Sequence, residues 1–185
     1  MSGSLKRALG LWVASQVDGL HVVADDLANR QRRYPACTVT ETAHDVRPLG
    51  CGKKDHTTRD TETGHVDSAG RLHTEETGFR LLVSAPSDRE QAGEEIVAGV
   101  LATIKHAVLQ ANLASEPLIL TDSEVEAPED FELDSLTITG RQPVPVDISG
   151  EPFVHRGALS LRVTRTVQVA APVEHVFEHI HVEGE

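Results

Sequence analysis

Aromatic side chains are scarce in this 185-residue chain, where one Trp, one Tyr and four Phe make up 3% of the residues. The hydrophobic share of 39% still suffices for a core, so Val, Leu, Ile and Ala have to pack it. A chain of this length can bury one sizeable core, and we expect a single α+β domain over residues 1–185.

Basic residues are also few. Lys and Arg number 17 against 29 Asp and Glu, which gives a formal net charge of -12. This balance argues against a general nucleic-acid binder, because contacts to phosphates require clustered Lys and Arg. It suits a soluble protein, or a surface past which DNA slides without sticking.

Cysteine and long apolar runs are rare as well. The two cysteines, Cys37 and Cys51, are too few for a disulfide framework, and we expect reduced thiols in the cytoplasm. Residues 5–27 are interrupted by polar side chains and do not resemble a signal peptide. Since the sequence has no stretch of about 20 apolar residues, we expect no membrane span.

Motifs for catalysis are missing. The chain has no G-x-S-x-G, no Walker loop and no G-x-G-x-x-G. The acidic run 122–134 could supply paired carboxylates, but a useful acid–base pair needs burial to separate its pKa values, and such a run is typical of a solvated loop. We therefore expect no enzyme activity, no catalytic residues and no cofactor.

The best-defined part of the sequence is residues 79–113. Residues 79–83, Phe-Arg-Leu-Leu-Val, indicate a strand. Ser87 and Glu90 have the spacing of a capping box, which predicts a helix start. Downstream, apolar residues recur at steps of three and four and predict one buried stripe; these are Ile96, Val97, Val100, Leu101, Ile104 and Val108.

The N-terminal region is expected to be helical over residues 3–33, with Gly19 as a break or kink that makes two short helices equally consistent. Tyr34-Pro35 would end it, and residues 36–42 alternate as a strand.

From residue 47 to residue 78 apolar side chains nearly vanish. A long loop is one reading; we prefer a polar hairpin arm, with residues 55–62 against 70–77 and a turn near 66–70.

The second half of the chain is expected to add antiparallel strands to the sheet. Its clearest strand alternates with Leu159, Leu161, Val163, Val167 and Val169 facing the core. The expected elements are a short strand at 117–120, an acidic linker at 122–130, a strand at 136–139, a proline loop at 143–145, the long strand at 157–169 and a tail at 173–185. The predicted fold is thus a mixed, mostly antiparallel sheet packed against an N-terminal helix and one central amphipathic helix, with a long polar hairpin arm.

Ten histidines make a metal site worth weighing. Near the arm the candidate ligands are Cys37, His44, Cys51, His56, His65 and His73. Their gaps of 7, 7, 5, 9 and 8 residues do not match the tight ligand pairs of a structural zinc site. His175 and His179 would share a helix face, with His181 following, but the Glu of H-E-x-x-H is not beside the first His. We interpret these histidines as polar surface residues and expect no metal.

Three stretches resemble the small tail terminator and tail-completion proteins of long-tailed phages. Residues 33–39, Arg-Tyr-Pro-Ala-Cys-Thr-Val, are similar to that family's entry into its first strand after an N-terminal helix. Residues 79–90 are similar to its central strand-to-helix step, and residues 159–169 to its late sheet strand. The order helix, strand, polar arm, strand, helix and antiparallel strands also resembles the family.

The resemblance implies a structural virion protein, an α/β subunit that assembles into a ring, commonly a hexamer, at the head-proximal end of the tail tube. Such a ring stops tube polymerisation and offers a surface to the head–tail connector. The implied partners are further copies of the chain, the tail tube, the connector and, in a contractile tail, the sheath. DNA would pass through the ring without specific binding, and the ring would lie in the virion neck after assembly in the host cytoplasm.

Under this reading the important residues form subunit interfaces. The arm at 47–78 and the extended insertion at 122–157 depart from a minimal family member and could contact sheath, collar or adjacent subunits. We expect subunit contacts from polar arm residues and from basic residues that could meet a neighbour's carboxylates; these are Arg59, Asp60, Glu62, Arg30, Arg32 and Arg33. Exposed ion pairs are individually weak, so they would set register more than affinity.

Other readings stay open. Another tail adaptor, at the head-closure or baseplate position, would share much of this pattern. A metal-binding module using the His and Cys residues of the arm predicts stoichiometric zinc. A small-molecule or peptide-binding α+β module predicts a pocket.

Overall fold

The computed structural model describes residues 4–23, 34–48, 56–59, 66–87, 90–147 and 153–170. Within these ranges the elements are α1 (Leu5–Gln16), β1 (His21–Val23), β2 (Ala36–Pro48), β3 (His56–Arg59), β4 (Val66–Ser87), α2 (Glu90–Leu113), β5 (Leu118–Asp122), β6 (Glu129–Leu133), β7 (Ser135–Asp147) and β8 (Phe153–Ala170). The fold is α+β with a mixed, mostly antiparallel sheet, an N-terminal helix and a central helix, as predicted.

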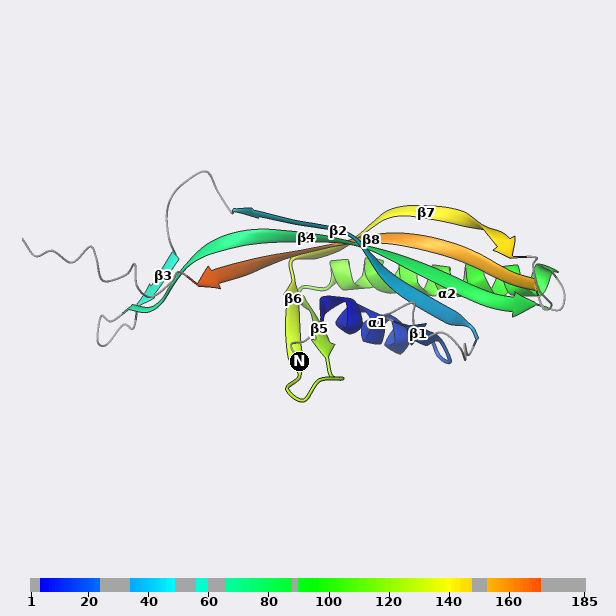
Figure 1. The fold of residues 1–185 in the computed structure, drawn as a ribbon, viewed down its shortest axis with the longest axis horizontal. Coiled ribbons are helices and arrows are strands. Elements are labelled where there is room, and N and C mark those ends of the chain that lie inside the picture. The colour runs from blue at the N-terminus through cyan, green and yellow to red at the C-terminus, as the bar shows by residue number, and fades with distance from the viewer. Residues whose placement is uncertain are drawn as a thin grey trace, which may run out of the picture. The chain divides into compact units, whose positions relative to one another are not determined.

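The main sheet has the strand order β1-β2-β4-β8-β7, and β3 pairs with β4 outside this path. β1 is parallel to β2, whereas β7 is antiparallel to β8 and β3 is antiparallel to β4. β5 and β6 form a separate antiparallel hairpin. Figure 1 draws α1 and α2 on one side of the main sheet, so the other face of its central strands has no helix over it in the described part of the chain.

The chain divides into two compact units. The first comprises Met1–His44 and Glu76–Arg165, and it holds both helices and the hydrophobic core. The second comprises Asp45–Glu75 and Thr166–Glu185. The expectation of a single domain stays a prediction.

The core lies between the sheet and α2. Alternate residues of the central strands are fully buried, among them Leu81 on β4 and Leu161 on β8, together with Ile104 on α2. Close packing of helix on sheet is visible at Gly157, where an added Cβ would lie 2.7 Å from Leu101 Cδ1 and 2.8 Å from Val97 Cγ1. The helix therefore touches β8 where the strand has no side chain.

The first helix ends before Gly19, which agrees with the predicted break at this residue, but no second helix follows directly. α1 ends at Gln16, and Gly19 has a φ of 72°, a left-handed conformation that favours glycine and ends the helical segment. His21–Val23 then forms a strand beside β2, since Val22 and Val23 are β-branched residues that suit a sheet. A helix continuing through residue 23 is therefore wrong, and residues 24–33 lie outside the described ranges.

The buried stripe of α2 is largely as predicted. The core includes five residues of this stripe, all of them buried: Val97, Val100, Leu101, Ile104 and Val108. The expectation for Ile96 is wrong, because its side chain is 43% exposed at the margin of the stripe. The predicted cap, formed by the side chains of Ser87 and Glu90, lies outside the described part of the structure.

A polar hairpin is present, but with another register. The sequence-based pairing placed the turn at 66–70, whereas Val66 and Gly70 are themselves paired, with Arg59 and His56. The connection thus falls within residues 60–65, outside the described part. The error arose because β-branched Val66 continues a strand despite the neighbouring Ser and Gly. Residues 71–77, assigned to the arm's return strand, belong to β4, a strand of 22 residues.

The acidic linker predicted at 122–130 is wrong in part. β5 runs to Asp122, and Glu129–Leu133 forms β6, which pairs with it from Leu118↔Leu133 to Asp122↔Glu129. Phe131 and Leu133 are buried, whereas Glu132 between them is exposed. This is the period-two pattern of a half-buried strand, which acidic composition obscured.

The proline loop predicted at 143–145 is also wrong. Pro143 lies within β7, opposite Gly157 of β8, and the strand continues to Asp147. Proline is tolerated here because β7 is the edge strand next to β8 and needs no hydrogen bond on its outer side. The long strand at 157–169 is confirmed as part of β8, with Leu159, Leu161 and Val163 buried.

Candidate functional site

Among the described residues of the first unit, the carboxylate of Asp122, at the end of β5, is a buried group with several hydrogen-bond donors. Its side chain is fully buried, and Oδ2 accepts hydrogen bonds from the Ser4 backbone amide at 2.7 Å and from Arg7 Nε at 3.0 Å. Arg7 Nη2 lies 2.9 Å from the same oxygen. On its other side, Oδ1 accepts a longer bond of 3.3 Å from the Glu124 amide.

These contacts decide the ionisation of Asp122. Burial acts to raise its pKa, but the Ser4 amide, the Arg7 side chain and the Glu124 amide outweigh burial and hold the pKa below its ordinary value. The carboxylate is therefore charged at neutral pH, where it fixes the start of α1 to the β5–β6 hairpin. Because Ser4, Arg7 and Glu124 all donate hydrogen bonds to Asp122, we interpret this carboxylate as a structural group.

The candidate metal ligands do not form a cluster within the described residues. Cys37 is fully buried in the core, and burial raises the pKa of its thiol to about 12. His44 lies on β2 with Nδ1 3.2 Å from Thr77 Oγ1. Cys51 and His65 fall outside the described ranges. Among the residues described, no group of three His, Cys, Asp or Glu side chains could hold a metal ion.

The predicted interface residues are not placed. The side chain of Arg59 on β3 is not described, and Arg30, Arg32, Arg33, Asp60 and Glu62 lie outside the described ranges, as do the C-terminal histidines. Their role in subunit contacts stays a prediction.

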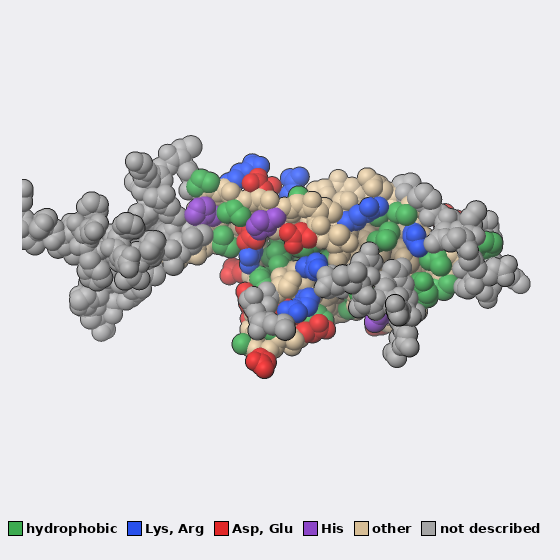
Figure 2. Space-filling view, in the orientation of Figure 1, with side chains coloured by type: hydrophobic (Ala, Val, Ile, Leu, Met, Phe, Trp, Pro, Cys, Tyr) green, Lys and Arg blue, Asp and Glu red, His purple; other side chains and the backbone are tan. Residues whose placement is uncertain are grey.

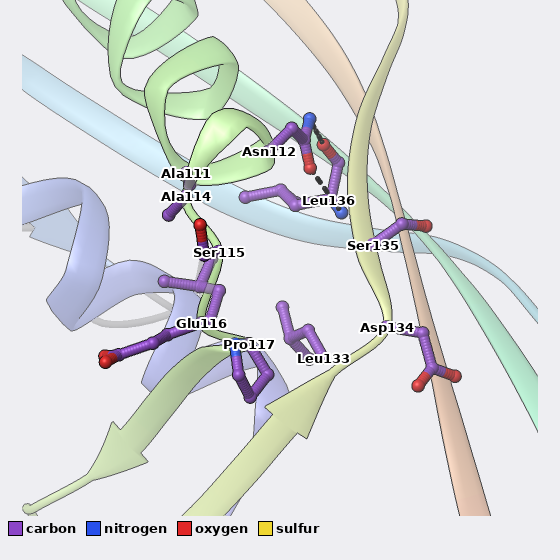
Figure 3. A pocket seen from close by; sticks show the side chains of 11 residues that line it. Ala111, Asn112, Ala114, Ser115, Glu116, Pro117, Leu133, Asp134, Ser135 and Leu136 are labelled. Atoms are coloured by element: carbon purple, nitrogen blue, oxygen red, sulfur yellow. Dashed lines mark hydrogen bonds between the residues drawn. The ribbon is translucent and has the colours of Figure 1, made fainter.

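One groove lies at the C-terminal end of α2, with a cavity volume of about 260 Å³. Asn112 spans its upper side, donating from Nδ2 to the Leu136 carbonyl at 2.6 Å and accepting from the Leu136 amide at 3.4 Å (Figure 3). Figure 3 shows the carboxylates of Glu116 and Asp134 pointing away from each other. The groove thus lacks a convergent acid pair, and its side-chain amide serves to tie α2 to β7.

A second groove, of about 330 Å³, lies between α2 and the β7–β8 edge. Its apolar floor includes Val97, Leu101 and Gly157, and its rim carries Glu94 and Arg141. Charges of both signs at the rim fit neither a purely anionic nor a purely cationic ligand. The face drawn in Figure 2 is similarly mixed, with Lys and Arg side chains among Asp and Glu and hydrophobic ones.

A third surface of the first unit is the side of α2 turned away from the core. At 100° per residue, one stripe centres opposite the buried residues. We call it the α2 outer face; its members, all exposed, are Glu95, Gly99, Ala102, His106, Leu109 and Leu113. Leu109 is 49% exposed and Leu113 is 84% exposed. Residues at i and i+4 adjoin on a helix surface, so Leu109 and Leu113 form one exposed apolar patch that a partner could cover.

By length and composition, Ala92–Leu113 could also cross a membrane, and it is the one helix in the described residues of which this is true. The sequence-based exclusion of a span was therefore too strict. A core helix meets the same criteria, and α2 does bury one stripe against the sheet. The absence of a membrane partner stays a prediction.

Sequence reasoning missed two of these features. It treated Asp122 as part of a solvated run, although the alternation that places it on β5 was readable in residues 118–122. It also overlooked the α2 outer face, because it followed one apolar stripe and left Leu109 and Leu113 unassigned.

No protein-family model matches the sequence, and comparison with curated proteins gives no match.

Proposed function

We propose that this chain is a structural subunit of a phage or phage-like tail, forming a ring that terminates the tail tube and joins it to the head connector. The observation that carries the proposal is where the three family-like stretches lie. Residues 34–39 enter β2, residues 79–87 complete β4, and residues 159–169 lie in β8. These three strands are consecutive neighbours in the main sheet, and β4 leads to α2.

Two physical features support a self-assembling subunit. The α2 outer face leaves Leu109 and Leu113 exposed, which a partner surface would remove from water. The net charge of -12 suits a ring through which DNA passes, because like charge keeps the DNA from sticking. Rings follow from a contact between two different faces that repeats until it closes.

A tube-length assay tests the function. Tail tube protein from the same genome is polymerised with and without this chain, and tube lengths are measured by negative-stain electron microscopy. We expect shorter tubes that end in a ring of about six copies, six being the number the family resemblance implies. Tubes of unchanged length without terminal rings would refute the tail-terminator function, while rings at the opposite tube end would favour a baseplate adaptor.

A further inference from the structure

We infer that the α2 outer face docks on the helix-free face of the main sheet in a second copy of this chain. This inference rests on the ring-forming function proposed above. We define the sheet outer face by four exposed residues on four strands of the main sheet, Thr40, Arg80, Thr137 and Arg162. Each lies next to buried core residues of its own strand, so it points away from the helices.

The helix side has both the apolar residues and the room for a close contact. Near the end of α2, Leu109 is about half exposed and Leu113 is mostly exposed. About three turns before Leu109, a Cβ added to Gly99 would meet nothing within 4 Å. Glycine inside a helix is less favourable than alanine, and none of the described residues requires the space at Gly99. The missing side chain leaves room for a partner.

The charges on the two faces are opposite. Arg80 and Arg162 are exposed, and within the described residues neither makes an ion pair or hydrogen bond. On the helix face, Glu95 is exposed and likewise without a partner in the described parts of the chain. Glu95 of one copy can therefore meet an arginine of the next.

A contact between two α2 outer faces would use these groups less well. Packing two α2 helices antiparallel would place Glu95 near Leu109 of the other copy, leaving Glu95 and both sheet arginines unpaired. Such a contact is also symmetric and closes as a dimer, whereas helix on sheet is directional and can repeat around a ring.

The size of the helix face sets the expected strength. A helix of 24 residues is about 36 Å long and about 10 Å wide, or about 360 Å² in outline. A specific interface usually buries about 800 Å² per partner. One such contact is therefore weak alone, and closure of a ring, in which every copy makes two of them, is needed for stability. Assembly should depend steeply on concentration.

Charge exchange between the two faces tests the inference. The helix variant is Glu95→Arg, and the sheet variant combines Arg80→Glu with Arg162→Glu. Each alone juxtaposes like charges and should raise the concentration at half-assembly about tenfold or more, as read by light scattering after size exclusion. An equimolar mixture restores opposite charges at every contact and should assemble within about threefold of wild type. Glu132→Arg, an exposed residue of β6, is the matched control and should assemble like wild type.

Gly99→Leu is a second and independent probe. It should block assembly while leaving the monomer folded and no less stable, because leucine is a better helix former than glycine and open space surrounds the site. Circular dichroism melts of each variant separate loss of assembly from loss of folding.

The outcomes separate this docking from the ring function. If the helix variant and the sheet variant each form rings as readily as wild type, or if their mixture stays dissociated, the docking is overturned while the tube-length result stands. Wild-type protein that remains monomeric alone and on tail tubes would overturn both. The full chain is also tested on phosphatidylcholine–phosphatidylglycerol vesicles. Binding that is lost in the Leu113→Glu variant would overturn the docking, because the α2 outer face would then bind lipid.

Discussion

Replacing Asp122 by alanine should destabilise the protein strongly, although the residue lies in what reads as an acidic surface run. The change leaves the Arg7 guanidinium and the Ser4 amide without their acceptor. Removing one partner of a buried ion pair costs about 3–5 kcal/mol. Since the Arg7 side chain is 29% exposed and can regain water, we expect the lower end, about 3 kcal/mol. For a chain of 185 residues this lowers Tm by roughly 6–12 °C.

Urea unfolding followed by circular dichroism measures the loss at pH 7. Glu132→Ala, which removes an exposed carboxylate from the same hairpin, is the control and should stay within about 0.5 kcal/mol of wild type. A double-mutant cycle with Arg7→Ala should give a coupling energy of about 1.5–3 kcal/mol, the range for hydrogen bonds to charged groups.

The effect should also depend on pH with a definite sign. The folded pKa of Asp122 is lowered, so its contribution is complete above the unfolded pKa of about 3.9 and is lost as the pH falls through the folded value. The stability difference between wild type and Asp122→Ala should therefore shrink below about pH 4. A variant within about 0.5 kcal/mol of wild type at pH 7, or a difference constant down to pH 2, would refute this account of the cluster.

Three further predictions concern the core and the α2 contacts. Gly157→Ala should lower the free energy of unfolding by about 1–3 kcal/mol, because the new Cβ would overlap the α2 side chains. Gly140→Ala is the control, since its Cβ would meet Ser160 Cβ at an ordinary 3.9 Å, and it should stay within about 0.5 kcal/mol of wild type in the same urea unfolding. The Cys37 thiol should resist iodoacetamide at pH 8 until the protein unfolds, since burial raises its pKa to about 12. Mass spectrometry of the peptide that contains Cys37 measures the labelling, and rapid labelling of the native protein would contradict the prediction. Asn112→Ala should cost about 1–2 kcal/mol by losing both bonds to the β7 backbone, and an unchanged Tm would show that water replaces them.

The fold was predictable where periodicity and composition agree. Leu159, Leu161 and Val163 alternate over a long run, and the spacing from Val97 to Val108 fits only one helix face, so both elements were found. The boundaries failed where a local signal was outweighed by the sheet. Pro143 lies inside β7 because an edge strand leaves one side unpaired, which depends on strand order and cannot be read locally.

The site was harder to predict than the fold. Asp122 gains its role from Arg7, 115 residues away in sequence, and no local pattern encodes such a pair. The exposed leucines of α2 looked like ordinary members of an apolar helix until their outward direction was known. Direction depends on which stripe meets the sheet, and the sequence offers apolar residues on more than one side of this helix.

The segment 45–75 leaves and re-enters the first unit on two neighbouring strands, β2 and β4. His44 Nδ1 lies 3.2 Å from Thr77 Oγ1, so the chain leaves the first unit and returns to it at adjacent points on neighbouring strands. A two-residue Asn-Gly turn could join these points without altering the register, because type I′ turns match the twist of paired strands. Recombination could thus lengthen, shorten or exchange this segment as a cassette while the core keeps its sequence.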